Sequence, residues 1–330
     1  MTSFFNYLWD VIRAFIAYFQ HIQIKDPQNH IILITGCDSG FGLMTVYRLL
    51  QQGYFVVALC LTEQGVSELQ EYAKTNGFND RCVVLRCDVT KEEDVKKVYE
   101  KVEGLLKGND SLKFWALVNN AGIAISGFAD WLSTEAYHKT FDVNFFAIVN
   151  LTKVFLQQLK RFKNSRIINI CSLAGISGSP NLSAYSASKH ALEGFAKCLR
   201  LELMTWNVHV ANINPGYMRT PIIAKGMNSM RIEYDKAPKE IRDQYPVESL
   251  NVGEEKVREL EEDPSFVVDS IIENITRASP TMNNYPGKYA KRFIWSSWFT
   301  PTIVKQVLGI VGMKYSGFGP HPEVLQKIQK

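Results

Sequence analysis

Residues 30–53 read HIILITGCDSGFGLMTVYRLLQQG, and this stretch decides the fold of the chain. HIILIT is a continuous apolar run typical of a buried strand, and MTVYRLLQQG has the pattern of a helix that ends at Gly53. The turn between them holds Gly36, Gly40 and Gly42 in a G-x-x-x-G-x-G spacing, without the Gly-Lys-Ser/Thr sequence of a P-loop. These glycines favour a tight turn and close approach of a phosphate, so we expect a dinucleotide pyrophosphate at the helix N-terminus.

The alternation of strand-like and helix-like segments continues through most of the chain. Further buried-strand patterns lie at residues 54–61, 81–87, 114–122, 166–171 and 208–216. Helical patterns separate them, including long ones over 133–162 and 185–204. Strands and helices that alternate in this way form βαβ units with right-handed crossovers. The sequence predicts an α/β fold, a doubly wound parallel sheet of the Rossmann type, with ligands at the carboxyl edge of its strands.

The length and the flanking segments predict one main domain with two additions. The 330 residues suit a single α/β domain over 30–290, in which the loosely patterned residues 222–253 are a candidate substrate lid. Residues 1–29 contain a short apolar helical stretch, interrupted by Asp10, and then a linker. This stretch favours a helix associated with a membrane surface, and packing on the protein itself is the alternative. Residues 291–330 are an apolar C-terminal extension.

The overall composition excludes several function classes. The net charge of +4 comes without the clustered Lys/Arg stripe of a nucleic-acid-binding protein. The six cysteines form no C-x-x-C pair, and no histidine lies at metal-ligand spacing, so we expect no metal site. Several cysteines lie in strand-like apolar runs, which predicts free thiols in a reducing compartment.

The stretch over residues 166–189, RIINICSLAGISGSPNLSAYSASK, carries the candidate catalytic groups. Ser172 follows the strand, and Tyr185 and Lys189 lie four residues apart on one face of the next helix. A neighbouring ammonium favours the phenolate form of tyrosine, and a serine hydroxyl can donate to the same oxygen or to a substrate oxygen. The trio predicts proton transfer to or from an alcohol or carbonyl, although Y-x-x-x-K alone also fits a solvated helix face. The loop serines that compete with Ser172 for this role are Ser177, Ser179 and Ser183.

The end of the second strand bears on the choice between NAD and NADP. Residues 60–63 read CLTE, with neither Asp nor Arg at the strand tip. Asp38 would repel an additional phosphate if it lies near the adenosine ribose, and no Lys or Arg occurs in residues 36–44 to receive one. We therefore expect NAD(H) rather than NADP(H). Asp88 is placed to accept a hydrogen bond from adenine, or else to cap the following helix, as Thr90 could.

These motifs together resemble those of the short-chain dehydrogenase/reductase family. They are TGCDSGFG (35–42), DV (88–89), NNAG (119–122), Asn144, Ser172, Tyr185-x-x-x-Lys189 and NPGYMRT (214–220). The variants TGCDSGFG and CLTEQG (60–65), with a looser match over 279–304, are similar to the retinol dehydrogenase and 17β-hydroxysteroid dehydrogenase branch. The resemblance covers residues 30–225 and implies an oxidoreductase with a nicotinamide cofactor.

The resemblance implies a role for each candidate residue. Tyr185 takes up the alcohol proton in oxidation and donates it in reduction, Lys189 also binds the nicotinamide ribose, and Ser172 orients the substrate oxygen. Asn144 holds a water that extends the proton path toward Lys189; without the resemblance it is an ordinary polar residue on a helix face. The residues expected to bind the cofactor are Gly36, Asp38, Ser39, Gly40, Phe41, Gly42, Leu61, Asp88, Val89, Asn120, Ala121, Gly122, Tyr185, Lys189, Pro215, Gly216 and Thr220.

The expected substrate is a large apolar alcohol, ketone or aldehyde, because the terminal segments are aromatic-rich and the lid carries Met and Tyr; retinoids and hydroxysteroids are both open. The resemblance also implies association with the endoplasmic reticulum membrane and a homodimer formed through the long helices. Lys25 and the free thiols favour a cytosolic catalytic domain. One alternative is a soluble dehydrogenase of a small hydroxy acid such as 3-hydroxybutyrate, for which Arg219 and Arg231 are the basic candidates. The other is a non-catalytic NAD-binding scaffold.

Overall fold

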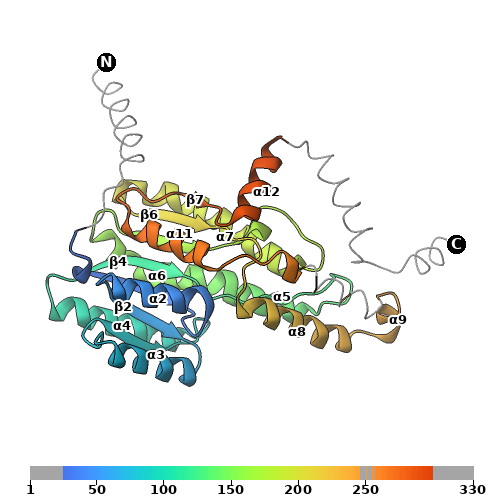
Figure 1. Ribbon diagram of the computed structural model, residues 1–330, viewed down its shortest axis with the longest axis horizontal. Helices are drawn as coiled ribbons and strands as arrows, with labels where there is room; N and C mark the ends of the chain where they lie inside the picture. The colour runs from blue at the N-terminus through green and yellow to red at the C-terminus, as the bar shows by residue number, and fades with distance from the viewer. Residues whose placement is uncertain (1–24, 246–249, 251–254, 256, 300–330) are drawn as a thin grey trace, which may run out of the picture.

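The computed structural model describes residues 25–245, 250, 255 and 257–299. Within these residues lies a seven-stranded parallel sheet of order β3-β2-β1-β4-β5-β6-β7 (Figure 1). The strands are β1 His30–Thr35, β2 Phe55–Cys60, β3 Cys82–Arg86, β4 Lys113–Asn119, β5 Arg166–Ile170, β6 His209–Ile213 and β7 Asn283–Asn284. The doubly wound parallel sheet predicted from the sequence is confirmed. The two-residue strand β7 was not predicted, because two asparagines carry no strand pattern.

Helices cover both faces of this sheet, and others lie beside it. The helices of the described residues are α2 Gly40–Gln51, α3 Glu63–Thr75, α4 Glu92–Gly108, α5 Thr134–Phe141, α6 Ala147–Lys160, α7 Ser183–Leu203, α8 Pro221–Lys236, α9 Lys239–Arg242, α11 Ser265–Thr276 and α12 Lys288–Phe299. One hydrophobic cluster joins a sheet face to α2, α3 and α11, and a second joins the opposite face to α4, α6 and α7. Strands β1, β2, β4, β5 and β6 are largely buried for this reason, as their hydrophobic runs predict. The predicted burial is wrong for β3, which lies at the sheet edge and is only partly buried.

The strand order reverses between β1 and β4, which places their carboxyl ends side by side. Ile34 pairs with Val118 in the register of these strands. One position further on, a row of buried amides crosses β4, β5 and β6: Asn119 Nδ2 donates to Asn169 Oδ1 at 2.9 Å, and Asn169 Nδ2 donates to Asn212 Oδ1 at 3.1 Å. These bonds fix the relative positions of the three strands near their carboxyl ends, at the edge of the sheet where ligands bind in such folds.

The single long helix predicted over 133–162 is wrong in one respect. Helices α5 and α6 are separated by a π-helical turn, Asp142–Phe146, in which the backbone N–H of Ala147 donates to Asp142 O. Inside this turn the Asn144 side chain forms hydrogen bonds with the backbone of Ile123. A wider turn of this kind is common at functional sites, because it directs one side chain out of the regular helical pattern.

The part expected to be a lid is more regular than its composition suggests. Residues 221–236 form the helix α8, which packs with the short helix α9 around a small cluster that includes Trp131, Met230 and Tyr245. Helix α12 crosses the expected domain boundary at residue 290. The N-terminal segment over 1–24 and the end of the C-terminal extension lie outside the described residues.

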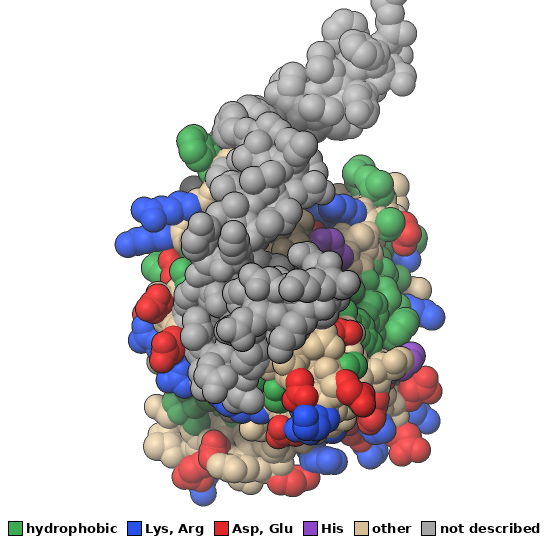
Figure 2. Space-filling model, turned by 90° about the vertical axis from the view of Figure 1, so that its right-hand side faces the viewer, with side chains coloured by type: hydrophobic (Ala, Val, Ile, Leu, Met, Phe, Trp, Pro, Cys, Tyr) green, Lys and Arg blue, Asp and Glu red, His purple; other side chains and the backbone are tan. Residues whose placement is uncertain are grey.

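The length of the helices and the distribution of surface charge concern membrane and nucleic-acid binding. Among the described residues, none of the helices has the length and apolar character needed to traverse a lipid bilayer. On the face drawn in Figure 2, described Lys and Arg side chains are interspersed with Asp and Glu and do not form a continuous cationic stripe.

Candidate active site

The turn between β1 and α2 can pack closely against its neighbours because its glycines lack side chains. Gly36 and Gly40 have φ angles of +69° and +59°, a region that favours glycine. A Cβ at Gly36 would lie 2.9 Å from Ala121 Cα, and one at Gly42 would lie 2.3 Å from Gly36 O. Ser39, in extended backbone, precedes the first residue of α2. The turn therefore presents bare backbone and the N–H groups of a helix N-terminus, which fits a pyrophosphate.

The turn after β4 is tied directly to this glycine turn. Asn120 Nδ2 donates to Thr35 O at 2.8 Å and to Gly36 O at 3.0 Å. Thr35 Oγ1 accepts from the backbone N–H groups of Asn120 and Ala121 at 2.9 and 2.8 Å. The segment that begins at Asn120 is therefore held as one wall of the crevice at the strand-order reversal.

Asp38 reaches from the glycine turn to the carboxyl end of β2. Its carboxylate accepts hydrogen bonds from the backbone N–H of Leu61 at 2.8 Å, and from the backbone N–H and hydroxyl of Thr62 at 2.9 and 2.6 Å. Burial alone would raise the pKa of Asp38, but these hydrogen bonds outweigh it and lower the pKa of the carboxyl. The strand tip, which has no aspartate of its own, thus acquires an ionised carboxylate from Asp38.

A cation that the sequence analysis missed lies at the same corner. Arg86 is in register with Cys60 on the neighbouring strand, and its Nε lies 3.4 Å from Glu63 Oε1. Residues 36–44 contain no cation, whereas strand pairing brings Arg86 of β3 next to the tip of β2.

Asp88 stabilises the turn that follows β3 by accepting hydrogen bonds from Thr90. Its Oδ1 accepts from the backbone N–H of Thr90 at 3.0 Å and from the Thr90 hydroxyl at 2.7 Å. The residue preceding α4 is Lys91, which makes no side-chain capping bond, so neither Asp88 nor Thr90 is the helix cap considered above. Val89 is buried against the core beside them. The segment lies at the carboxyl end of β3, the strand next to β2.

Tyr185 and Lys189 lie on α7 as predicted, and burial shifts the pKa values of both side chains. Lys189 is buried, its Nζ donates to Ile170 O at 2.8 Å, and this nitrogen lies 5.7 Å from the centre of the Tyr185 ring. Loss of solvation raises the pKa of the Tyr185 phenol to about 12, whereas the nearby Ser172 side chain lowers it. Burial lowers the pKa of Lys189. Desolvation therefore outweighs the Ser172 hydrogen bond at the Tyr185 phenol, and the lowering of this pKa by the ammonium stays a prediction.

Ser172 is the loop serine placed beside Tyr185. It precedes a short 3₁₀ turn, Leu173–Gly175, and its Oγ accepts from the backbone N–H of Ala174 at 3.1 Å. Two competing serines have other hydroxyl partners: Ser183 Oγ is 2.6 Å from Tyr137 Oη, and the Ser179 side chain hydrogen-bonds Tyr217. Ser177 Oγ donates to Gly178 O, on the exposed part of the loop.

The side chains of Asn144 and Lys189 both lie close to Gly122. Asn144 is fully buried; its Oδ1 accepts from Ile123 N–H and its Nδ2 donates to Ile123 O, both at 2.9 Å. A Cβ at Gly122 would lie 3.3 Å from Asn144 Oδ1 and 3.7 Å from Lys189 Nζ. Asn144 is therefore not an ordinary polar residue on a solvated helix face, and a side chain at Gly122 would fill the space between the two groups.

The loop after β6 closes the opposite side of the crevice. The backbone N–H of Leu173 donates to Pro215 O at 3.0 Å, which joins this loop to the turn that carries Ser172. A Cβ at Gly40 would lie 3.6 Å from Thr220 Cγ2, so Thr220 faces the glycine turn. The loop over residues 215–220 thus lies between the glycine turn and the catalytic groups.

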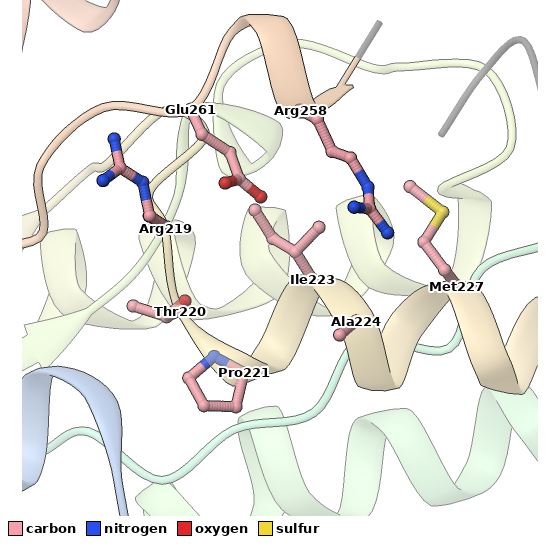
Figure 3. Close-up of a pocket in the computed structure, with 8 residues that line it drawn as sticks. All are labelled: Arg219, Thr220, Pro221, Ile223, Ala224, Met227, Arg258 and Glu261. Carbon is pink, nitrogen blue, oxygen red and sulfur yellow. The ribbon is translucent and has the colours of Figure 1, made fainter. Parts of the chain in front are cut away.

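Beyond Thr220 a cavity of about 470 Å³ opens beside α8 (Figure 3). Its lining combines apolar side chains with charged ones: Arg219, Thr220, Pro221, Ile223, Ala224, Met227, Arg258 and Glu261. Of the two basic candidates proposed from the sequence, Arg219 lines the cavity and Arg231 is not among the lining residues. Arg258 was missed, since nothing in the sequence pattern indicates that residues 258–261 approach α8.

Comparison with known proteins agrees with this geometry. Residues 30–230 match the family model of the short chain dehydrogenases. The chain is 31% identical over 277 residues to an uncharacterized oxidoreductase, YusZ, of Bacillus subtilis, covering 81% of this chain and 95% of that protein. It is 33% identical to the mitochondrial D-beta-hydroxybutyrate dehydrogenase of Mus musculus, covering 81% and 79%, and 31% identical to retinol dehydrogenase 7 of Mus musculus, covering 90% and 92%.

Solved structures show the same fold. A short-chain dehydrogenase from Streptomyces avermitilis superposes with a TM-score of 0.63 at 20% identity, covering 87% of this chain and 97% of that one. A short-chain dehydrogenase/reductase from Burkholderia phymatum, solved in complex with NAD, gives a TM-score of 0.64 at 21% identity, covering 79% and 90%. The protein belongs to the short-chain dehydrogenase/reductase family, and its relatives include retinol dehydrogenases.

Proposed function

We propose that this protein is an NAD(H)-dependent dehydrogenase/reductase that interconverts a hydrophobic alcohol and its carbonyl, with retinoids and hydroxysteroids as the substrate classes. The observation that carries the proposal is the convergence of Tyr185, Lys189, Ser172 and Asn144 beside the turn over 120–122, which is bonded to the glycine turn. A non-catalytic scaffold would need only the glycine turn and gives no reason for this arrangement.

The residues at the crevice fit a dinucleotide. The glycine turn and the N-terminus of α2 would hold the pyrophosphate, and the Asp38 carboxylate the adenosine ribose. Asp88 and Val89 would border the adenine, while Asn120–Gly122 and the loop over 215–220 would border the nicotinamide half. Such a cofactor supplies or accepts the hydride, and the protein provides position and proton transfer.

Tyr185 would transfer the proton at the substrate oxygen. Desolvation raises the pKa of Tyr185 to about 12, so the phenol stays protonated at neutral pH and would act as the proton donor in carbonyl reduction. In the oxidation direction the proton taken up at Tyr185 Oη would leave past Lys189 and Asn144 through a bound water. Ser172 would donate a hydrogen bond to the substrate oxygen and fix it beside the phenol.

The raised phenol pKa predicts opposite pH dependences for the two directions. Because Tyr185 stays protonated until high pH, the rate of carbonyl reduction should be flat through neutral pH and fall only at alkaline pH. Alcohol oxidation requires loss of the same proton, so its rate should rise toward alkaline pH. Steady-state kcat measured across this range in both directions tests the assignment; an oxidation rate that falls as pH rises would contradict it.

Cofactor preference should depend on Asp38. In the Asp38→Asn variant the charge that repels a 2′-phosphate is removed while Arg86 remains nearby, so the ratio of NADP to NAD efficiency should rise by about tenfold. The ratio of kcat/KM values for the two cofactors measures this shift. Glu68→Gln, which removes an exposed carboxylate further along α3, is the matched control and should leave the ratio unchanged. An unchanged ratio in Asp38→Asn would remove Asp38 from the cofactor site.

The substrate class rests on the cavity beside α8 and on the relatives. Its volume of about 470 Å³ and its lining by Ile223, Ala224 and Met227 suit a large apolar body. The direct test is a panel of all-trans-retinol, 3- and 17-hydroxysteroids and 3-hydroxybutyrate, each assayed with NAD and NADP. Turnover of a retinoid or steroid with NAD is the expected result, and turnover of 3-hydroxybutyrate alone would contradict it.

A second candidate function is oxidation of a small hydroxy acid. Arg219 and Arg258 line the same cavity and could receive a carboxylate, and one relative is a D-beta-hydroxybutyrate dehydrogenase. Under this alternative Arg219→Gln raises the KM for 3-hydroxybutyrate, and Arg231→Gln, outside the cavity lining, does not. Under the main proposal neither change impairs turnover of the apolar alcohol.

Membrane association at the endoplasmic reticulum and a homodimer are also part of the proposal. Membrane association rests on the apolar stretch within residues 1–24 and on the likeness to retinol dehydrogenases, and sedimentation of the full chain with vesicles tests it.

The homodimer is supported by Phe146, which is 56% exposed in the turn between α5 and α6 beside Phe141 and Phe145. A monomeric mass in solution would contradict the dimer.

A further inference from the structure

Glu262 joins three segments that are distant in sequence, and it lies beyond the residues matched by the family model. Its backbone N–H donates to Tyr217 O at 2.9 Å, and its carbonyl accepts from the backbone N–H of Arg219 at 3.0 Å. These bonds form a parallel bridge with Met218. Residue 262 is thus paired, like a short strand, with the loop over 215–220 that borders the glycine turn.

The side chain of Glu262 holds the start of α12. Oε1 accepts from the backbone N–H of Lys288 at 2.7 Å, and Oε2 accepts from that of Tyr289 at 3.2 Å. The first N–H groups of a helix have no partner within the helix, and a carboxylate there also interacts favourably with the helix dipole. Gly287, with φ of +88°, makes room for this contact, since a Cβ there would lie 2.3 Å from Glu262 Oε2.

The first turn of α12 in turn covers the same loop. A Cβ at Gly216 would lie 2.9 Å from Tyr289 Cδ1, so the Tyr289 ring rests on bare backbone at that position. The rings of Tyr217 and Tyr289 are 6.1 Å apart and tilted by 54°. Glu262 and Tyr289 therefore fix both the backbone of the loop and the direction of Tyr217.

The loop held in this way reaches the catalytic groups. The Tyr217 phenol is hydrogen-bonded to Ser179, and its electrostatic effect contributes to the raised pKa of Tyr185. Pro215 O accepts from Leu173 N–H, one residue after Ser172. Any shift of the loop is therefore transmitted to the catalytic serine and to the surroundings of the catalytic phenol.

We propose that Glu262 and Tyr289 are positioning residues for the nicotinamide half of the cofactor, acting through the loop over 215–220. Helix α12 and the cofactor then order the same loop. Packing of α12 against the loop therefore favours cofactor binding, and cofactor binding favours packing of α12 to the same extent. The inference rests on the proposed function in one respect, that this loop borders the nicotinamide. It adds the C-terminal helix to the parts of the chain that set cofactor affinity.

Two measurements on the full chain test this coupling without requiring turnover: NADH affinity by fluorescence titration, and hydrogen exchange of the Lys288 and Tyr289 amides with and without saturating NADH. In Glu262→Ala, NADH should bind about tenfold more weakly. The variant loses the carboxylate that accepts hydrogen bonds from the Lys288 and Tyr289 N–H groups and so holds the start of α12 against the loop over 215–220. In the wild type NADH should slow exchange at both amides, and in Glu262→Ala that response should be lost.

The control and the second variant separate positioning from folding. Glu259→Gln changes an exposed carboxylate of the same segment and should leave NADH affinity and exchange as in the wild type. Glu262→Gln keeps the side-chain volume and one carbonyl acceptor, so this variant should fold. It should weaken NADH binding by a smaller factor of about threefold. If Glu262→Ala does not fold, Glu262→Gln tests the positioning role instead.

Faster exchange at the two amides with unchanged NADH affinity would overturn the proposal, since Glu262 would then only anchor α12. A wild-type chain that binds neither NADH nor NADPH would overturn the proposed function as well. The two failures are distinguished by the wild-type titration.

Discussion

Tyr185→Phe is expected to lower kcat in both directions by about 10²- to 10⁴-fold, because it removes the group that exchanges a proton with the substrate oxygen. The change deletes one oxygen and leaves the ring, so the affinity for NADH and the melting temperature should stay close to those of the wild type. Steady-state kinetics with the best substrate of the panel, together with an NADH titration, measure both quantities.

Tyr137→Phe is the matched control for this loss. It also removes one phenol oxygen, 2.6 Å from Ser183 Oγ on α7, but outside the set of groups at the crevice. Its kcat should remain within a few-fold of the wild type. Should Tyr185→Phe keep wild-type turnover, proton transfer must occur at another group and the assigned mechanism fails.

Gly42→Ala should have the largest effect on cofactor binding. The added Cβ would lie 2.3 Å from Gly36 O and 2.6 Å from Asn120 Nδ2, so α2 must move away from the turn or the Asn120 bridge must break. Overpacking of this kind costs about 1–3 kcal/mol of stability. Because the displaced atoms form the pyrophosphate site, NADH affinity should fall by at least about tenfold, as measured by titration alongside thermal unfolding.

A second Gly→Ala change tests whether this effect is local. Gly104 lies within α4, and a Cβ there would meet nothing within 4 Å. Gly104→Ala should stabilise the protein by about 0.5–1 kcal/mol through the higher helix propensity of alanine, with NADH affinity unchanged. If both variants bind NADH equally well, the turn over 36–42 is not the pyrophosphate site.

The fold could be read from the sequence because each strand carries its own signal. β1, β2 and β5 are continuous apolar runs, and such runs are diagnostic when helices separate them. The location of the site followed from the same pattern, since Gly36 and Asn120 come directly after strands and Ser172 follows β5 with one residue between. Strand β7 was missed because it is held by its neighbours rather than by any propensity of Asn283 and Asn284.

The contacts within the site depend on geometry that one sequence does not contain. Within the π-helical turn Asn144 bonds the backbone of Ile123, 21 residues away in the sequence. Asp38 supplies the carboxylate at the tip of β2 from a different segment, and desolvation raises the Tyr185 pKa. Spacing predicts which groups share a helix face, but their protonation depends on what surrounds them.

In the proposed reaction hydride and proton are exchanged at one site, between a bound dinucleotide and a substrate oxygen beside Tyr185. This exchange can be followed with an alcohol from the panel deuterated at the carbinol carbon and mass spectrometry of the NADH recovered after a single turnover. The wild type should deliver the deuterium to the nicotinamide, and Tyr185→Phe should deliver little or none in the same time. Product formed by the wild type without deuterium in the NADH would contradict the account.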